Sequence, residues 1–478
     1  MTPEITLPVA ELKQALPGLA KLVSKSRTLP VLQSVRVQRD AEGVVTLEVT
    51  DLDTHVAYRL PDAQAGQPAE VLVPFDALLK TAKGSSETLT LIPDGQDKVR
   101  LRHHIGNSPV EQRISCPELK EWPATPKITA PLVSLDPQFG PTLKEALLCA
   151  SDDSSRVVLK GACLDVTDPK AHYVVGTNGR ILFAANSFSF GLKQSVIIPA
   201  GKFLAWHGFL SGDSCELAVQ NDPKNQNHWV QLRTPRWTYT ARQIEGNYPN
   251  WKNALPTLTA QGTTLQLSPE AVTQLLEVVP QLPGGENPNR PVRLAVAQHE
   301  LYVEARPQDD APWTQIRIAG VAVQGPDLTV SLNRELLLQA LRYGLNQIEL
   351  ELPDGVALFS RGGRKCAVKL LTPTLPPPAP TATPPTAATA TPTEPATATP
   401  TERKVMPQET KPTKPTTQEP LKLALERIEA LRETLKNTVR ELGDVTDALK
   451  AADREQKASA KEVESVRATL RSLQKVAI

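Results

Sequence analysis

The 478-residue sequence has no C-x-x-C pair, no excess of charge of either sign and no long apolar run. The five cysteines are far apart, so we expect small buried hydrophobic residues rather than metal ligands or disulfide partners at Cys116, Cys149, Cys163, Cys215 and Cys366. The formal net charge of +1 argues against a simple polycationic nucleic-acid binder, although it is compatible with a basic stripe on one face. No run approaches the ~18 apolar residues of a membrane span, and the first residues lack the basic and apolar regions of a secretory signal. These absences predict a cytoplasmic protein.

The motifs of common catalytic sites are also missing. The sequence contains no P-loop, G-x-G-x-x-G, H-E-x-x-H or G-x-S-x-G. Turn and capping roles explain Asp51, Asp53, Asp152 and Asp153 better than a metal cluster does. The run from Ser360 to Lys365 is explained by a hairpin turn. We therefore expect no catalytic residues, no metal and no cofactor.

The composition changes near Leu375. Up to that residue, 37 lysines and arginines stand against 38 aspartates and glutamates, as in ordinary globular domains. Residues 376–420 contain thirteen prolines interleaved with threonine and alanine, a composition that cannot bury a core and predicts a disordered linker. From Leu421 onward apolar residues return at spacings of three and four, which predicts a coiled-coil helix over residues 421–478.

Six similar units precede the linker. Each has a helix-spaced apolar stretch followed by alternating apolar runs separated by turns. The six helices are predicted in LPVAELKQALPGLAKLVS, VPFDALLKTAKG, DPQFGPTLKEALLCASDD, IPAGKFLAWHGFLSG, LSPEAVTQLLEVVPQL and SLNRELLLQALRYG. One such unit cannot bury its apolar face alone, so the units should pair into three α+β domains, 1–128, 129–257 and 258–375, with helices on one side of antiparallel sheet.

Two local patterns repeat between units. Hairpin crossings are predicted at residues 50–54 and 176–180, written TDLDT and GTNGR. Aromatic-proline corners close the second unit at Trp122-Pro123 and the fourth at Tyr248-Pro249-Asn250-Trp251.

Several segments of residues 1 to about 375 stand in an order and spacing shared with one known family. They are TLPVLQSVRVQ, TLEVTDLDTHV, SSRVVLKGACLDV, VVGTNGRILFAAN, RQIEGNYPNW and SLNRELLLQALRYG. Together they make this part of the chain resemble the β sliding clamp, the β subunit of bacterial DNA polymerase III. The resemblance implies the DNA-clamp fold, with three similar domains of two helix-plus-antiparallel-strand units each. It also implies that two chains close head to tail into a homodimeric ring around duplex DNA.

A sliding ring needs contacts with phosphates and no base readout. With the inward helices that the resemblance implies, the DNA-facing residues would be Lys13, Lys21, Lys25, Arg27, Lys80, Lys83, Lys144, Arg156, Lys202, Arg334 and Arg342. Without it, ordinary solvated helix faces explain each of them. The fifth predicted helix carries Glu270 and Glu277 and no basic residue. Contact with double-stranded DNA is therefore expected to be non-sequence-specific, loose and salt-sensitive.

The resemblance also implies a cleft between the second and third domains that receives a short apolar peptide of DNA polymerase, clamp-loader or repair proteins. Carried over by position, its residues are Leu159, Thr177, Gly179, Leu182, Pro249, Leu370, Leu371 and Pro373. The alternative for Leu159, Leu182 and Leu370 is that they are plain core residues. The chain departs from the family at Arg180-Ile181, in place of His-Arg. It also departs at Asn253-Ala254, in place of Arg and a branched apolar residue, and at Thr372 and Thr374, in place of two methionines. A smaller apolar slot and a different partner motif are expected.

The predicted coiled coil needs a partner, because a narrow apolar seam is not satisfied by a lone helix in water. Parallel or antiparallel self-association, a hairpin folded about Gly443 and a different protein partner all stay open. Because the linker leaves beside the cleft, the tail could hold a partner there or compete with it.

The leading function is a DNA sliding clamp that confers processivity on a replicative DNA polymerase. The alternative is a clamp-like interaction scaffold that acts through its coiled coil and is not loaded on DNA. A hydrolytic enzyme is third, since it would require a catalytic constellation that the sequence does not contain.

Overall fold

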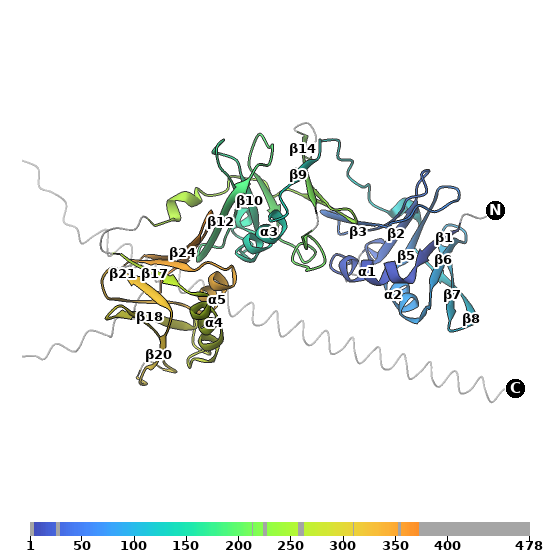
Figure 1. Cartoon of the computed structure of the whole chain (residues 1–478). Helices are drawn as coiled ribbons and strands as arrows, with labels where there is room; N and C mark the ends of the chain where they lie inside the picture. Colours follow the sequence, from blue (N-terminus) through green and yellow to red (C-terminus); the bar gives the residue numbers. More distant parts are fainter. Residues whose placement is uncertain are drawn as a thin grey trace, which may run out of the picture. The chain divides into compact units, whose positions relative to one another are not determined.

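The computed structural model describes residues 4–24, 29–212, 214–222, 227–256, 262–308, 310–351 and 355–371 (Figure 1). All of these residues belong to one compact unit, Met1–Thr381, and a second unit spans Ala382–Ile478. The predicted linker and coiled coil, 376–420 and 421–478, lie outside the described residues.

The strands of the described residues form four antiparallel sheets. The first has the order β1 (Ile5–Pro8), β6 (Thr88–Pro93), β7 (Lys98–Ile105), β8 (Ser108–Ser115). The second has the order β5 (Ala69–Pro74), β2 (Ser34–Arg39), β3 (Val45–Thr50), β4 (Thr54–Arg59), β16 (Trp237–Arg242), β15 (Asn227–Arg233), β14 (Cys215–Asp222), β9 (Val133–Leu135).

The third sheet has nine strands and the fourth has four. The third has the order β13 (Val196–Pro199), β10 (Gly161–Asp165), β11 (His172–Thr177), β12 (Ile181–Phe188), β25 (Arg364–Lys369), β24 (Val356–Arg361), β23 (Gln347–Leu350), β17 (Thr263–Leu267), β21 (Val321–Gln324). The fourth has the order β20 (Thr314–Ile318), β19 (Glu300–Ala305), β18 (Pro291–Ala297), β22 (Leu328–Asn333).

Six three-stranded meanders make up most of these sheets, one for each predicted unit. They are β2-β3-β4, β6-β7-β8, β10-β11-β12, β14-β15-β16, β18-β19-β20 and β23-β24-β25. The units pair by exchanging a strand: β1 leads into the first unit's helix but pairs with β6 of the second, while β5 leads into the second helix and pairs with β2 of the first. The same exchange joins β9 to β14, β13 to β10, β17 to β23 and β22 to β18. The pairs define three modules, β1 to β8, β9 to β16 and β17 to β25; the domain boundaries stay predictions.

Five α-helices cover one face of the sheets in the described chain. They are α1 (Val9–Leu19), α2 (Phe75–Gly84), α3 (Phe139–Leu148), α4 (Pro269–Val278) and α5 (Arg334–Arg342). Short 3-10 turns are η1 (Pro30–Gln33), η2 (Leu119–Glu121), η3 (Val157–Leu159), η4 (Trp251–Ala254) and η5 (Val279–Gln281). Helices α1 and α2 pack on each other, as do α4 and α5 (Figure 1). Ser268 caps α4 through the Ala271 amide, and Asn333 caps α5 through the Glu335 and Leu336 amides.

The predicted fourth helix is wrong. Residues 200–212 form turns, and glycines at 201, 208 and 212 disfavour a helix there. The rings of Phe203, Trp206 and Phe209 instead gather on the module's own sheet, where Phe203 lies 5.2 Å from Trp237 between ring centroids. A Cβ on Gly18 of α1 would collide with the rings of Trp206 and Trp237, so this cluster packs directly on the first module. Aromatic packing across a module boundary has overridden the helical spacing.

Two sheets continue from one module into the next. β4 pairs with β16 across the first boundary, and β12 pairs with β25 across the second. The predicted hairpin crossings are confirmed and share their hydrogen bonds: Thr50 Oγ1 donates to the Thr54 carbonyl at 2.8 Å, and Thr177 Oγ1 donates to the Ile181 carbonyl at 2.7 Å. Residues 361–364 form the predicted hairpin turn between β24 and β25. None of the helices in the described chain has the length and apolar character that a bilayer crossing requires.

Candidate partner-binding site

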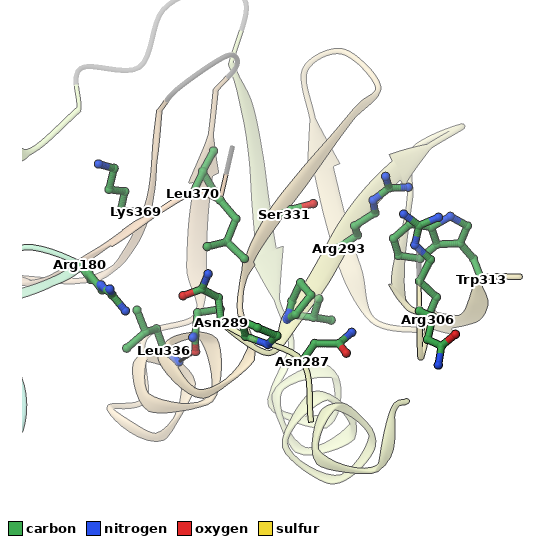
Figure 2. A pocket seen from close by; sticks show the side chains of 16 residues that line it. Arg180, Asn287, Asn289, Arg293, Arg306, Trp313, Ser331, Leu336, Lys369 and Leu370 are labelled. Atoms are coloured by element: carbon green, nitrogen blue, oxygen red, sulfur yellow. Dashed lines mark hydrogen bonds between the residues drawn. The ribbon is translucent and has the colours of Figure 1, made fainter. Parts of the chain in front are cut away.

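A cavity of about 500 Å³ lies against the third module, where the strands β18 and β22 meet the start of α5 (Figure 2). The end of β25 and the loop before β12 also reach it through Lys369 and Arg180. Asn287, Asn289 and Asn333 add amide groups to its wall. The cavity therefore combines segments of the second and third modules and lies at the joint where a partner cleft was predicted.

One part of the cavity is apolar. Its side chains are Pro291, Val292, Leu336, Leu370 and Leu371. The chain is fixed there by main-chain bonds, because the Leu371 amide donates to the Ser331 carbonyl at 2.7 Å and the Leu370 amide to the Gly355 carbonyl at 3.3 Å. This part can receive aliphatic or aromatic side chains of an extended peptide.

The other part is cationic and is built around Trp313. The guanidinium carbon of Arg293 lies 3.7 Å from the centroid of the indole, and that of Arg306 lies 4.6 Å from it. Figure 2 shows both arginines beside the indole. Burial lowers the pKa of Arg293, and the nearby charge of Arg306 acts in the same direction while Glu304 opposes it. With Arg180 and Lys369, the described lining contains four cationic side chains and no carboxylate.

The residues predicted for the peptide cleft fall into two groups. Leu370 and Leu371 line the cavity. Leu159, Thr177, Gly179, Leu182 and Pro249 are not among its described lining residues. Leu159 and Leu182 are buried, while Gly179 and Pro249 are exposed. Pro373 lies outside the described residues.

The hydroxyl of Thr177 is hydrogen-bonded within its own turn. Its Oγ1 donates to the Ile181 carbonyl and accepts from the Gly179 amide at 3.1 Å, so both functions serve the turn. Gly179 has a φ of +86°, a conformation that glycine adopts at little cost. The threonine and the glycine therefore hold the turn in shape and place Arg180 at the cavity.

Leu182 belongs to a second apolar cluster, on the sheet face opposite the helices. Trp251 fills this cluster and donates from Nε1 to Asp165 Oδ2 at 2.7 Å. Burial alone would raise the pKa of Asp165, but hydrogen bonds from Thr167 and Trp251 outweigh it and lower the pKa. The predicted corner at Tyr248–Trp251 thus follows β16 and is secured to β10 by a charge-assisted hydrogen bond.

The basic residues predicted to face DNA differ in their availability. Seven are exposed: Lys13, Lys21, Lys80, Lys83, Lys202, Arg342 and Arg156. Lys144 is half-buried and donates from Nζ to the Phe209 carbonyl, and burial lowers its pKa. Lys25 and Arg27 lie outside the described residues.

Two arginines of that set have other roles. The prediction for Arg334 is wrong, because the residue is 3 % exposed and donates to the carbonyls of Leu282 at 2.6 Å and Pro283 at 2.5 Å. Its guanidinium holds the turn after α4, a loop contact that helix spacing does not indicate. Arg156 is exposed but pairs with Asp153 at 2.9 Å and donates to the Asn178 carbonyl at 3.3 Å. It therefore lies beside Gly179, at the rim of the predicted cleft.

Beta sliding clamps are similar to this chain in sequence and in structure. The Escherichia coli K12 beta sliding clamp is 22% identical over 342 residues, which cover 69% of this chain and 87% of that protein. A Pseudomonas aeruginosa sliding clamp solved with griselimycin superposes with a TM-score of 0.65 at 19% identity, covering 78% of this chain and 100% of the other. The Bacillus subtilis sliding clamp gives a TM-score of 0.66 at 14% identity, covering 78% and 99%. No family model matches the sequence. The described chain has the fold of DNA sliding clamps.

The sequence did not point to Arg293, Arg306 or Trp313. Arg293 is a single polar residue in the strand β18. Trp313 follows a loop for which the sequence pattern predicts neither a helix nor a strand. Only the pairing of β18 with β19 and of β19 with β20 brings the three side chains together. No local motif marks that contact.

Proposed function

We propose that the protein is a DNA sliding clamp, which gives processivity to a replicative DNA polymerase by encircling duplex DNA. The clamp fold over the described residues supports this, and so do the sequence matches to beta sliding clamps. Polymerase and clamp-loader subunits would dock in the cavity at the joint of the second and third modules. The protein would tether the polymerase to DNA and would catalyse no chemical step.

The observation that carries the proposal is the regular way in which modules join. The third strand of a module's first meander, β4 or β12, pairs with the third strand of the second meander of the following module, β16 or β25. At the first boundary Trp237, the first residue of β16, lies opposite Tyr58, the fifth of β4. At the second boundary Arg364, the first residue of β25, lies opposite Ala185, the fifth of β12. The two joints therefore share one register.

The strands that hold the corresponding places in the second and fifth meanders are β8 and β20. Each is the outermost strand of its sheet and has one neighbour, β7 or β19, among the described strands. Open edges of this kind favour pairing with another chain. Applying the shared register between two chains places Ser108 opposite Ile318 and Val110 opposite Ile316.

This register also places the core-facing side chains of β8 and β20 on the same side of the joined sheet. Ile316 of β20 and Ile114 of β8 both pack against the helix-side core. Since side chains alternate along a strand, Val110 lies on the same face as Ile114 and would meet Ile316. Two such contacts close two chains of three modules into a ring.

The exposed lysines would supply the DNA contact. Lys13, Lys80 and Lys83 belong to α1 and α2, the helix layer that the clamp resemblance directs toward DNA. With Arg334 removed from the set and Lys144 half-buried, the number of phosphate contacts is small. Binding should therefore be weak in open solution and depend on topology rather than affinity.

The experiment that tests the function is retention on DNA. Full-length protein, loaded on nicked circular duplex with a clamp loader and ATP, should co-elute with the circle through gel filtration and should be released after the circle is cut once. Ile316→Asp should prevent retention, and Ile316→Val should preserve it. Equal retention on circular and linear DNA would contradict the proposal. Loss on both would favour the scaffold alternative, which depends on residues 421–478.

The tail gives a further part of the proposal. The predicted linker begins five residues after Leu371, which lines the cavity, so a partner held by the tail would be held near the cavity. Truncation after Leu375 should leave ring formation intact and change peptide affinity at the cavity. Titration calorimetry of the two chains with one peptide measures this change, and equal affinities would contradict it.

A further inference from the structure

The chain leaves the last strand of every module in the same way. The residues that follow β8, β16 and β25 form three exit segments. The next residue but one after β16, Ile244, donates its amide to the Ile197 carbonyl at 3.1 Å. Its counterpart in the third module, Leu371, donates to the Ser331 carbonyl at 2.7 Å. The first residue of each segment donates to a carbonyl near the start of the neighbouring strand, and these pairs are Cys116 and Asp97 at 2.8 Å, Gln243 and His228 at 2.9 Å, and Leu370 and Gly355 at 3.3 Å.

In the first two modules the exit segment packs on one pair of strand residues. Trp122 packs against the apolar cluster that contains Leu72. In the second module Trp251 and Tyr248 pack in the cluster that contains Ile197. Both places are therefore occupied by the chain itself. The pair joins the third residue of each module's first meander to the strand beside it, and its members are Arg36 and Leu72, Cys163 and Ile197, and Arg293 and Ser331.

In the third module the corresponding pair lines the cavity. Arg293 and Ser331 both belong to its wall (Figure 2). Leu371, the last described residue, belongs to the wall as well, and the third exit segment continues from there. The cavity therefore lies at the position that the other two modules fill with their own exit segments.

The sequence of the third exit segment repeats a feature of the other two. Tyr248 stands four residues after Ile244. Leu375 stands four residues after Leu371, so the second and third segments share this spacing. Each segment contains an apolar residue followed by proline, which favours an extended backbone at the apolar residue, and these dipeptides are Trp122-Pro123, Tyr248-Pro249 and Leu375-Pro376.

We propose that residues 372–378 occupy the cavity of their own chain, with Leu375 in its apolar part, and that a partner peptide docks by displacing them. The inference rests on the proposed docking at this cavity and adds its regulation. A segment tethered directly beside its site acts at an effective concentration on the order of mM. Only peptides that bind more tightly than this intramolecular competitor would therefore dock.

The experiment uses the chain's own segment as the probe. A fluorescein-labelled peptide of residues 372–380, TPTLPPPAP, is titrated with full-length chains and followed by fluorescence anisotropy. The peptide should bind at least fivefold more tightly to Leu375→Ser than to the unaltered chain, because the variant vacates the cavity. The matched control Val405→Ser removes an apolar side chain further along the chain and should behave as the unaltered protein does. A peptide with serine in place of its leucine should bind none of these chains.

A second substitution assigns the binding to the cavity. Leu336 lines the apolar part, so Leu336→Asp in the Leu375→Ser chain should abolish binding of the peptide. Leu148→Asp in the same chain changes an exposed leucine outside the described lining and should leave binding unchanged. Far-ultraviolet circular dichroism should be the same for all of these chains.

The outcomes separate this inference from the proposed function. Equal affinity of the peptide for the unaltered chain and for Leu375→Ser would overturn the occupancy, and so would an absence of binding to both. Binding that survives Leu336→Asp would place the segment elsewhere and overturn the assignment. The function is judged by retention on circular DNA, in which Leu375→Ser should match the unaltered chain. Loss of retention by both chains would contradict the clamp and leave the peptide result standing.

Discussion

The hydroxyl of Tyr343, the residue that follows α5, donates a hydrogen bond to the main-chain carbonyl of Glu145 on α3, with 3.0 Å between the oxygens. The same hydroxyl accepts from Gln339 Nε2 at 2.6 Å, and Gln339 also donates to the Leu148 carbonyl at 3.3 Å. The Glu145 carboxylate forms an ion pair with Arg364 of β25. The second and third modules are thus joined by side chains as well as by the β12–β25 pair, and the cavity lies beside a fixed joint.

Tyr343→Phe should weaken this joint. The substitution leaves the Glu145 carbonyl without its hydroxyl donor and removes one of the acceptors of the Gln339 amide. An unsatisfied buried polar group typically costs ~1–3 kcal/mol. We expect a lower temperature for the first thermal unfolding transition, measured by calorimetry, with unchanged far-ultraviolet circular dichroism. Tyr302→Phe removes a hydroxyl that is bonded to Glu300 on a half-exposed strand and should change the transition far less. Equal effects of the two substitutions would contradict the joint's role.

The cysteines should differ in reactivity toward thiol reagents. Burial raises the pKa of Cys149 to about 12 and that of Cys215 to about 12, and it raises the pKa of Cys163 and Cys366 as well. At pH 8 these four are protonated and covered, whereas Cys116 is half-buried and has a more modestly raised pKa.

Native protein treated with iodoacetamide should therefore be labelled first and slowly at Cys116. All five cysteines should react after denaturation in guanidinium chloride, which serves as the control. Peptide mass spectrometry identifies the labelled positions. Early labelling of Cys149 or Cys366 would mean that the α3–α5 joint opens in solution.

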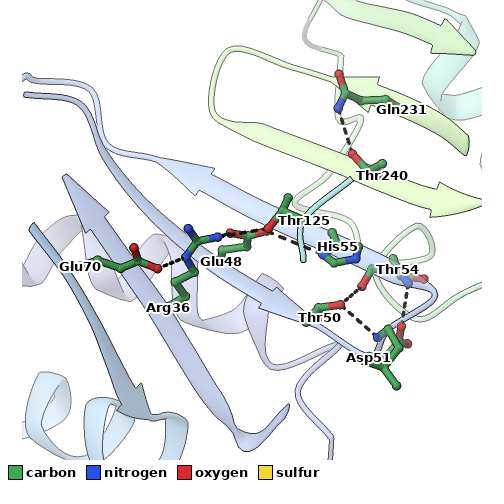
Figure 3. A network of polar contacts seen from close by, with 11 residues as sticks. Arg36, Glu48, Thr50, Asp51, Thr54, His55, Glu70, Thr125, Gln231 and Thr240 are labelled. Atoms are coloured by element: carbon green, nitrogen blue, oxygen red, sulfur yellow. Dashed lines mark hydrogen bonds and ion pairs between the residues drawn. The ribbon is translucent and has the colours of Figure 1, made fainter. Parts of the chain in front are cut away.

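Glu48 should make the first module sensitive to acid. Figure 3 shows its carboxylate between Arg36 and Thr125, with His55 nearby. A carboxylate oxygen lies 3.0 Å from Arg36 Nη1, and the other lies 2.8 Å from Thr125 Oγ1 and 3.7 Å from His55 Nδ1. Burial alone would raise the pKa of Glu48, but His55, Thr125 and Arg36 together outweigh it and lower the pKa. A carboxyl with a lowered folded pKa stabilises the protein above its unfolded value of ~4.3, and this stability is lost as pH falls through the folded value.

Glu48→Gln should therefore reduce stability at pH 7 and flatten the acid side of the stability curve below about pH 5. Thermal unfolding from pH 3 to 8 measures both effects. Glu70→Gln is the matched control, because Glu70 also pairs with Arg36, at 2.5 Å, but is more exposed. A wild-type acid slope in Glu48→Gln would show that other carboxylates determine it.

The sequence predicted what is local and repeated, and missed what depends on contacts between distant segments. The turns at Thr50 and Thr177 were predictable because a threonine followed by a tight crossing forms the same two hydrogen bonds in the first and third units. The five helices that formed have continuous apolar stripes. The fourth did not, because the rings of residues 203–209 find better partners on Trp237 and Tyr239 than a helix would give them.

In the site too, the residues that were missed depend on contacts between distant segments. Leu370 and Leu371 were predicted at the cleft from the resemblance to the clamp family, and they line the cavity. Arg334 has the spacing of a surface residue, but the turn that buries it comes from a loop 52 residues earlier. Trp313 acquires its two arginines only through sheet register, and register is not written in any short motif.

The proposed contact between two chains can be tested by its register. If the joint of β8 with β20 repeats the joints inside the chain, Val110 of one chain lies opposite Ile316 of the other, and facing Cβ atoms are ~4.5–5.5 Å apart. A chain carrying Val110→Cys and Ile316→Cys should form a disulfide-linked dimer under mild oxidation, since such a separation is near that of bridged cysteines.

The control moves one cysteine by one position. Val110→Cys with Gln315→Cys puts the two thiols on opposite faces of the sheet, because a shift of one residue reverses the face. This variant should give little covalent dimer in non-reducing electrophoresis, while its native mass stays that of the unaltered chain. Efficient crosslinking of both variants would mean that the edges are mobile or unpaired. A native mass of one chain for the unaltered protein would remove the ring, and with it the physical basis for tethering a polymerase by topology.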